Sequence, residues 1–136
     1  MVDQNCAYCV EGDLVAKFGI KICELETSKV YLFKEQSHPG RCIVAHKKHV
    51  GDMNELTAEE RAAYFEDVAR VARAIMAAFH PDKVNYGAYG DTGHHLHFHL
   101  CPKYKDEFEW GGVFLTNPDK KYLTDAEYAE MIEKIK

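Results

Sequence analysis

The chain has 136 residues, which is a usual length for one domain and too short for two. Its 22 acidic and 17 basic side chains give a net charge of −5, which excludes a broad basic surface for nucleic acid or an anionic membrane. No run reaches the ~18 apolar residues that a membrane span needs, and the first residues lack the basic and apolar segments of a signal peptide. We therefore expect a soluble, cytoplasmic protein whose residues 1–136 form a single domain, with local donors for a small anionic ligand.

The first motif along the chain is the cysteine pair in CAYC, residues 6–9. Two thiolates this close in sequence can bind one ion, typically zinc in a tetrahedral site with Zn–S distances of about 2.3 Å. A thioredoxin-like redox pair fits less well, because the motif neither follows a predicted strand nor opens a convincing helix. Two ordinary buried thiols are the remaining interpretation. The chain has five cysteines at uneven spacing, which argues against a secreted disulfide framework and favours reduced thiols.

Three short strands are predicted in the first half of the chain. Residues 14–26 and 28–35 carry β-branched and aromatic residues in short runs, which Glu, Thr and Ser separate as a turn would. The tripeptide HPG at 38–40 then interrupts the pattern. The run RCIVAHKKHV at 41–50 follows and predicts a third strand that ends in polar residues.

A long helix is predicted between Thr57 and Pro81. Its apolar positions recur at spacings of three and four: Phe65, Val68, Ala72, Ile75 and Phe79. This spacing places one apolar stripe on an otherwise charged and alanine-rich helix, which should pack across a sheet. Thr57 and Glu60 form a capping box at its start, and Pro81 follows its end.

The second half of the chain adds two strands and a short helix. Residues 83–91 and 94–102 are predicted as strands around Gly90, and 103–123 as an ordered loop. A helix over about 124–135 begins with a second capping box, Thr124 to Glu127. Its apolar residues share one face: Tyr128, Met131, Ile132 and Ile135. Together the elements predict an α+β fold with an antiparallel sheet of about five strands, one long helix packed across it, and a C-terminal helix.

The segment HHLHFHLCP, residues 94–102, is unusually rich in histidine. Side chains of a strand alternate between its faces, so His95, His97 and His99 are expected on one face at steps of about 6–7 Å. Any one of these histidines alone could be an ordinary polar residue on the exposed face of a strand. Three at strict period two, close to Gly90 and Gly93, favour a functional site. A pKa near neutrality lets each imidazole act as nucleophile, acid or hydrogen-bond donor.

The stretch HLHFHLC, residues 95–101, resembles the signature of the histidine triad (HIT) family, His-φ-His-φ-His-φ-φ with φ apolar. HPGRCIVAHKKHV and VNYGAYGDTG follow the family's order, so the resemblance covers roughly residues 6–118. It implies hydrolysis or transfer at the α-phosphate of a nucleotide conjugate: a nucleoside phosphoramidate, an aminoacyl-adenylate or a dinucleoside polyphosphate. His97 would attack phosphorus and form a covalent nucleotidyl intermediate that water cleaves. The carbonyl of His95 would orient His97, and His99 would donate to the phosphate oxygens.

The resemblance also implies contacts with the phosphate and the leaving group. Asn85 matches an asparagine near the family's site, and Thr92, next to Gly93, matches a hydroxyl residue that touches phosphate. Asp91 stands where the family commonly has Gln or Asn. It is either a turn residue before Gly93 or a partner for His94 or an amine leaving group.

The ribose position departs from the family's pattern. Phe33 or Lys34 occupies the place where an Asp or Asn often holds the ribose hydroxyls, and Glu35 is the nearest carboxylate. Phe33 is interpreted either as a base-stacking residue or as part of the core. Trp110 either closes over a ligand or, as a lone tryptophan more often does, packs against the sheet.

Many bacterial members of the family have an N-terminal CxxC, and the resemblance then implies four metal ligands: Cys6, Cys9, His49 and His95. A closed site of two cysteines and two histidines would hold a structural Zn²⁺ and lock the carbonyl that orients His97. His46 competes with His49 as the third ligand. The resemblance also implies a homodimer.

Two other functions stay open at this point. One is a nucleotide-binding module with little turnover, which the altered ribose and leaving-group positions would permit. The other is a metal-storage or metal-dependent hydrolase site built from the histidine cluster. In every case the expected partner is a small molecule rather than a nucleic acid or a membrane.

Overall fold

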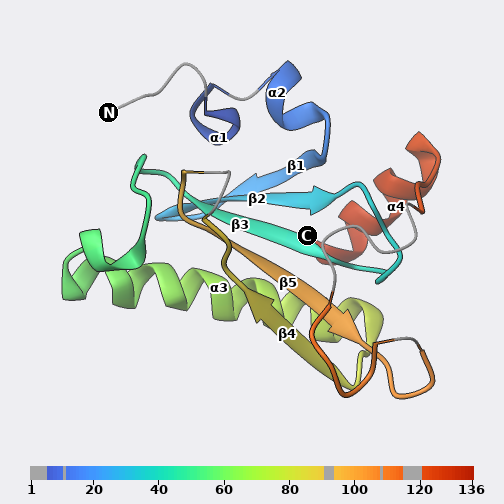
Figure 1. Ribbon diagram of the computed structural model, residues 1–136. Coiled ribbons are helices and arrows are strands. Elements are labelled where there is room, and N and C mark those ends of the chain that lie inside the picture. Colours follow the sequence, from blue (N-terminus) through green and yellow to red (C-terminus); the bar gives the residue numbers. More distant parts are fainter. Residues whose placement is uncertain (1–5, 11, 91–93, 108, 115–120) are drawn as a thin grey trace.

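The structure is a computed structural model, which describes residues 6–10, 12–90, 94–107, 109–114 and 121–136 (Figure 1). One antiparallel sheet holds five strands: β1 (Gly19–Glu24), β2 (Ser28–Phe33), β3 (Cys42–His46), β4 (Lys83–Gly87) and β5 (His97–Lys103). Their order across the sheet is β1-β2-β3-β5-β4. The helices are α1 (Ala7–Val10), α2 (Asp13–Ala16), α3 (Ala58–Phe79) and α4 (Asp125–Ile135), with a 3₁₀ turn at Met53–Glu55. The predicted fold class, including the long helix and the C-terminal helix, is confirmed.

The strands are shorter than the sequence pattern predicted. Residues 14–16, expected at the start of the first strand, lie in the helical turn α2, so that part of the prediction is wrong. Residues 47–50 and 88–90 also lie outside β3 and β4. His95 lies in a bend just before β5, and only His97 and His99 lie in the strand itself.

Helix α3 packs across one face of the sheet (Figure 1). Thr57 caps its start through the predicted capping box, and His80 ends it in the left-handed conformation with φ 50°. The apolar stripe is shifted by one residue at its first position. Phe65 is 39% exposed, contrary to the prediction, whereas Tyr64 is fully buried and donates a hydrogen bond to the carbonyl oxygen of Val44 at 2.7 Å.

Helix α4 joins the same core, because Tyr128 and Ile135 belong to the hydrophobic cluster formed by α3 and the sheet. The predicted capping box at Thr124 is present. Among the helices in the described part of the chain, none is long and apolar enough to cross a membrane.

The opposite face of the sheet is covered by α1 and α2 and by the chain after β5 (Figure 1). A second, smaller hydrophobic cluster lies there: Tyr8, Val15, Tyr31, Phe33, Ile43 and Ala45. The side chain of Lys103 is buried and donates to the carbonyl oxygens of Glu109 and Gly112, which holds the chain after β5 against the sheet. The histidines of β5 point to this face, and we call it the triad face.

Candidate functional site

Two of the triad histidines, His97 and His99, lie on the inner strand β5, and His95 lies just before it. In the register of β3 and β5, His97 pairs with Ala45 and His99 pairs with Ile43, both of which belong to the triad face. The rings of His97 and His99 make an edge contact, with centroids 5.4 Å apart. All three triad side chains are buried, with 2 to 8% of their surface exposed. A central strand thus presents the predicted cluster to one enclosed site.

His97 has one ring nitrogen fixed by the backbone. Its Nδ1 donates to the carbonyl oxygen of His95 at 2.7 Å. A neutral imidazole carries a single N–H, so this bond leaves Nε2 with an unprotonated lone pair. Burial lowers the pKa of His97, although the hydrogen bond to His95 works against that shift. The net lowering of the pKa and the fixed Nδ1–H thus favour a neutral ring whose Nε2 lone pair could act as a nucleophile.

His99 is held by an arginine that the sequence analysis did not single out. The Nη2 of Arg41 donates to the Nδ1 of His99 at 3.1 Å. The ring of Phe33 packs edge-on against His99 at 5.3 Å. Burial, the charge of Arg41 and the neighbouring His97 lower the pKa of His99 to about 3. His99 is therefore neutral at physiological pH.

Tyr8, one of the two residues between the motif cysteines, packs on the triad. Its ring centroid lies 5.1 Å from that of His97 and 5.4 Å from that of His95. The sequence analysis found no convincing helix at CAYC; the structure has a helical turn of four residues there, α1. The turn brings the thiols of Cys6 and Cys9 to one side and the Tyr8 ring to the triad.

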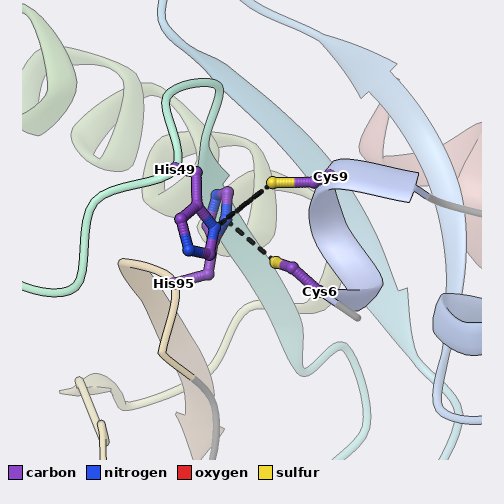
Figure 2. Close-up of side chains that lie close together, drawn as sticks. All are labelled: Cys6, Cys9, His49 and His95. Carbon is purple, nitrogen blue, oxygen red and sulfur yellow. Dashed lines mark hydrogen bonds between the residues drawn. The ribbon is translucent and has the colours of Figure 1, made fainter. Parts of the chain in front are cut away.

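The two cysteines meet two histidines in one cluster (Figure 2). Figure 2 shows the four side chains converging from three segments: Cys6 and Cys9 at α1, His49 after β3, and His95 before β5. The Nδ1 of His95 lies 3.2 Å from the Sγ of Cys6, 3.5 Å from the Sγ of Cys9 and 3.2 Å from the Nδ1 of His49. The Sγ of Cys9 lies 3.3 Å from the Nδ1 of His49.

These separations fit a metal site. Tetrahedral zinc, with bonds of about 2.0 Å to nitrogen and about 2.3 Å to sulfur, places its donor atoms about 3.3–3.8 Å apart. The Nε2 of His95 donates to the carbonyl oxygen of His46 at 2.6 Å, which leaves Nδ1 as the lone-pair nitrogen facing the cluster. The donor set, its spacing and this tautomer all suit one metal ion.

His46, the competing ligand in the sequence analysis, points away from this cluster. Its ring is buried on the α3 side, 5.1 Å from the ring of Tyr64, and its Nδ1 accepts a hydrogen bond from the backbone N–H of Lys48. Only its carbonyl oxygen reaches the cluster, through His95. The geometry therefore groups His49, and not His46, with the two cysteines.

The described residues line hollows at and near the triad. A hollow of ≈ 70 Å³ borders His95 and His97, between the 50s loop and the chain after β4. Asn85 lies on the triad face, since it pairs with Cys101 of β5. It lines a different hollow of ≈ 280 Å³, together with Lys83, Lys103 and Trp110. The lining of this second hollow contains no triad histidine among the described residues.

Other predicted substrate residues have mixed outcomes. Phe33 is buried and belongs to the small cluster of the triad face, which agrees with its interpretation as a core residue. Glu35 is also buried and accepts hydrogen bonds from Ser37 and from the backbone N–H of Lys121. Trp110 is 41% exposed and lines the second hollow with residues of β4 and β5, so it is not the buried tryptophan that was expected to be more common. The remaining predicted substrate residues lie outside the described residues: Asp91, Thr92 and Gly93.

Sequence reasoning missed the residues that surround the triad rings, above all Arg41, Tyr8 and Phe114. A usable signal existed for Arg41 alone. It stands two residues before Ile43 at the start of an apolar strand, and alternation puts both on one face. Phe114 reaches the site through a segment without a periodic pattern, and no local rule places it.

Comparison with known proteins identifies the family of the chain. The HIT domain family model matches residues 19–106. The chain belongs to the histidine triad family. The "Protein hit" of Bacillus subtilis is 30% identical to this HIT protein over 123 residues, which cover 85% of this chain and 83% of the relative. An adenosine 5'-monophosphoramidase of Schizosaccharomyces pombe is 27% identical over 141 residues, covering 97% and 99% of the two chains.

Solved structures agree in fold. A histidine triad protein of Sinorhizobium meliloti superposes with a TM-score of 0.83 at 21% identity, covering 91% of this chain and 92% of that one. A zinc-bound histidine triad family protein of Mycobacterium smegmatis gives a TM-score of 0.69 at 20% identity, with coverages of 96% and 91%. At these identities the likeness establishes the architecture of the HIT fold.

Proposed function

We propose that this HIT protein is a nucleotidyl hydrolase or transferase that acts at the α-phosphate of a nucleotide conjugate, with a nucleoside phosphoramidate as its first substrate class. The observation that carries the proposal is the fixed tautomer of His97, whose Nδ1 donates to the carbonyl of His95. The similarity to the yeast phosphoramidase supports the choice of substrate class. Aminoacyl-adenylates and dinucleoside polyphosphates are the other members of the proposed substrate range.

In the proposed reaction, the Nε2 lone pair of His97 attacks the α-phosphorus. The bond from phosphorus to the leaving nitrogen or oxygen breaks, and the leaving group departs with a proton taken up from the site or from solvent. This forms a nucleotidyl-histidine. Water then attacks the same phosphorus, the P–N bond to His97 breaks, and nucleoside monophosphate is released with the ring neutral again. A different acceptor in place of water would make the reaction a transfer.

The flanking histidines have separate roles in this proposal. The carbonyl of His95 holds the Nδ1–H of His97, so the attacking nitrogen is unprotonated at each turnover. His99 lies one strand position further along the triad face and donates to the phosphoryl oxygens as negative charge grows on them.

We also propose that Cys6, Cys9, His49 and His95 bind a structural Zn²⁺. Two thiolates and two imidazoles are the donors that zinc prefers, and a site with four protein ligands leaves no position for substrate. When bound, zinc would tie α1 to the bend before β5. His95 would then have both ring nitrogens engaged, which holds the carbonyl that orients His97.

The test is the release of AMP from adenosine phosphoramidate by the wild type and by His97→Ala. We expect the variant to lose at least about 10³-fold in kcat/KM, because it lacks the nucleophile. Rapid quenching followed by mass spectrometry is expected to find adenylate on the peptide that contains residue 97. Lysyl-adenylate and diadenosine polyphosphate, assayed in parallel, define the leaving groups that the site accepts.

His80→Asn is the matched control. His80 is exposed at the end of α3 in the left-handed conformation, which asparagine tolerates, so the variant should keep wild-type activity. Equal rates for His97→Ala and the wild type would refute the proposed nucleophile.

A nucleotide-binding module with little turnover is the second candidate. The observation that favours it is the ribose position, where Phe33 is buried beside His99 and Arg41 and has no polar group for the ribose hydroxyls. Calorimetry with AMP that shows binding in the micromolar range, with no AMP released from any of the three conjugates, would select this candidate.

A further inference from the structure

Arg41 is a buried cation beside the triad. Its side chain has no exposed surface, and its guanidinium carbon lies 4.3 Å from the ring centroid of Phe33 and 4.9 Å from that of Phe114. A charge removed from water in this way costs free energy unless it makes strong interactions. The faces of the two aromatic rings attract the cation, and the N–H groups at the edge of the guanidinium donate hydrogen bonds.

The edge of the guanidinium contacts His99, the third triad histidine. The Nη2 of Arg41 lies 3.1 Å from the Nδ1 of His99. A guanidinium has donors and no acceptor, and it stays protonated at every accessible pH. The Nδ1 of His99 must therefore accept, and it cannot carry a proton. Because a neutral imidazole has one N–H, the proton of His99 is on Nε2.

We propose that Arg41 is a positioning residue that fixes His99 as the neutral Nε2–H tautomer, so that this ring can only donate a hydrogen bond to the phosphoryl group. The tautomer of His99 rests on the geometry alone, and its donation to the phosphoryl group rests on the proposed function. Donation from a cation to Nδ1 also polarises the ring and strengthens its Nε2–H as a donor.

The charged and titratable groups around His99 support the neutral state. Arg41 approaches from the turn before β3, His97 from β5, and the ring of Tyr89 from the segment after β4, with centroids 6.1 Å apart. Phe33 and Phe114 supply apolar contacts. The nearby cation and the burial both disfavour a second proton on the ring, and the pKa of about 3 agrees. His99 is thus a hydrogen-bond donor to the substrate and not an acid that protonates the leaving group.

The turn that carries Arg41 is fixed by buried contacts. The side-chain amide of Gln36 donates to the carbonyl oxygens of Phe33 and Arg41 and accepts from the backbone N–H of Gly40. Gly40 has φ +94°, and a Cβ there would lie 2.7 Å from the ring of Phe79. These contacts fix the backbone of the turn and with it the position of Arg41.

The direct test is the tautomer of His99 in the wild type. Protein labelled with ¹⁵N-histidine is examined by long-range ¹H–¹⁵N correlation between pH 5 and 8, and a His99→Gln sample assigns the signal. We expect the Nε2–H pattern for His99 with no titration in this range. Either an Nδ1–H pattern or an imidazolium would overturn the inference, and this measurement needs no variant at Arg41.

Three substitutions then separate the hydrogen bond from the charge. Arg41→Met removes both, and we expect a mixture of tautomers at His99, a titration that moves into the measured range, and a 10- to 100-fold lower kcat on adenosine phosphoramidate with KM little changed. Arg41→Gln keeps a donor and should retain the Nε2–H tautomer and recover most of kcat. Arg73→Met, on the exposed side of α3, removes the same charge far from the site and should match the wild type.

The outcomes distinguish this inference from the proposed function. An Nε2–H tautomer that depends on Arg41, in a protein that releases no AMP from any conjugate, would support the role of Arg41 and contradict the proposed reaction. An unchanged His99 tautomer and unchanged kcat in folded Arg41→Met would overturn the inference while leaving His97 as nucleophile. Should Arg41→Met fail to fold, the tautomer of His99 in the wild type decides the inference alone, and Arg41→Gln tests the charge, whose loss should raise the pKa of His99.

Discussion

At the cysteine end of the triad, His95 turns its Nδ1 toward two thiols and His49, and its Nε2 donates to a backbone carbonyl. At the arginine end, His99 has the same tautomer with a different partner: its Nδ1 accepts from Arg41, and its Nε2 carries the proton. His97, between them, donates through Nδ1 and keeps Nε2 as a lone pair. Three residues of one type, repeated at period two, thus divide into two tautomers and have three different sets of partners.

The comparison teaches that the repeat and the roles have separate origins. Alternation along an extended segment makes the rings neighbours. The role of each ring comes from a partner elsewhere in the chain: a cysteine motif near residue 6 for His95, and a turn near residue 41 for His99. Changing those partners is therefore the way to test the difference between the two ends.

The largest effect is expected at the cysteine end. We predict that the double variant Cys6→Ser, Cys9→Ser loses the bound metal entirely, as measured by elemental analysis per chain. Its free energy of unfolding in urea should fall by about 3 kcal/mol or more when free zinc in the wild-type sample exceeds its Kd about a hundredfold. Cys23→Ser, at a half-buried thiol outside the cluster, is the control that should keep one ion per chain. Full metal content in the double variant would contradict the proposed metal site.

The second prediction decides between the two candidate histidines. His49→Ala should weaken metal affinity by more than about a hundredfold, because it removes a donor atom at 3.2–3.3 Å from two others. His46→Ala keeps the carbonyl that holds His95 and should leave the affinity within about threefold. Competition with a chromophoric chelator measures both. Equal weakening in the two variants would contradict the assignment.

The smallest effect is a pH dependence at the arginine end. The pKa of His99 is lowered from 6.5 to about 3, so the unfolded chain takes up a proton below pH 6.5 that the folded chain does not. The stability from this group is present above pH 6.5 and is lost as the pH falls toward 3. Between pH 7.5 and 5.5 the loss is about 1 kcal/mol. Urea unfolding should show that His99→Gln, which can still accept from Arg41, loses less stability over this interval; identical losses would contradict the shift.

Local patterns predicted much of the fold. The start of α3 and of α4 followed from capping boxes at Thr57 and Thr124, which depend on side chains three residues apart. Strand lengths were overestimated, because α2 and the bend at His95 are set by packing against other elements. Phe65 was placed in the core, although Tyr64 fills that position, since helical spacing alone does not say which of two adjacent aromatic residues faces the sheet.

The sequence predicted which residues come together in the candidate site better than it predicted the hydrogen bonds between them. The spacing of HLHFHLC and the CxxC motif named the residues that come together, through alternation and through the preference of zinc for thiolates. The partner of His99 was not found, because Arg41 approaches from 58 positions away and no sequence rule pairs an arginine with one histidine among several. Tautomers depend on such distant partners, so a single sequence does not reveal them.

Gly40 shows how far the demands of the site extend into the rest of the chain. It is only a turn residue, but its positive φ and the ring of Phe79 against it leave no room for any side chain. In a saturation mutagenesis screen we therefore expect this position to tolerate substitution as poorly as the histidines themselves. Its intolerance would be recorded as lost activity, although its cause is the geometry of the turn that leads into Arg41.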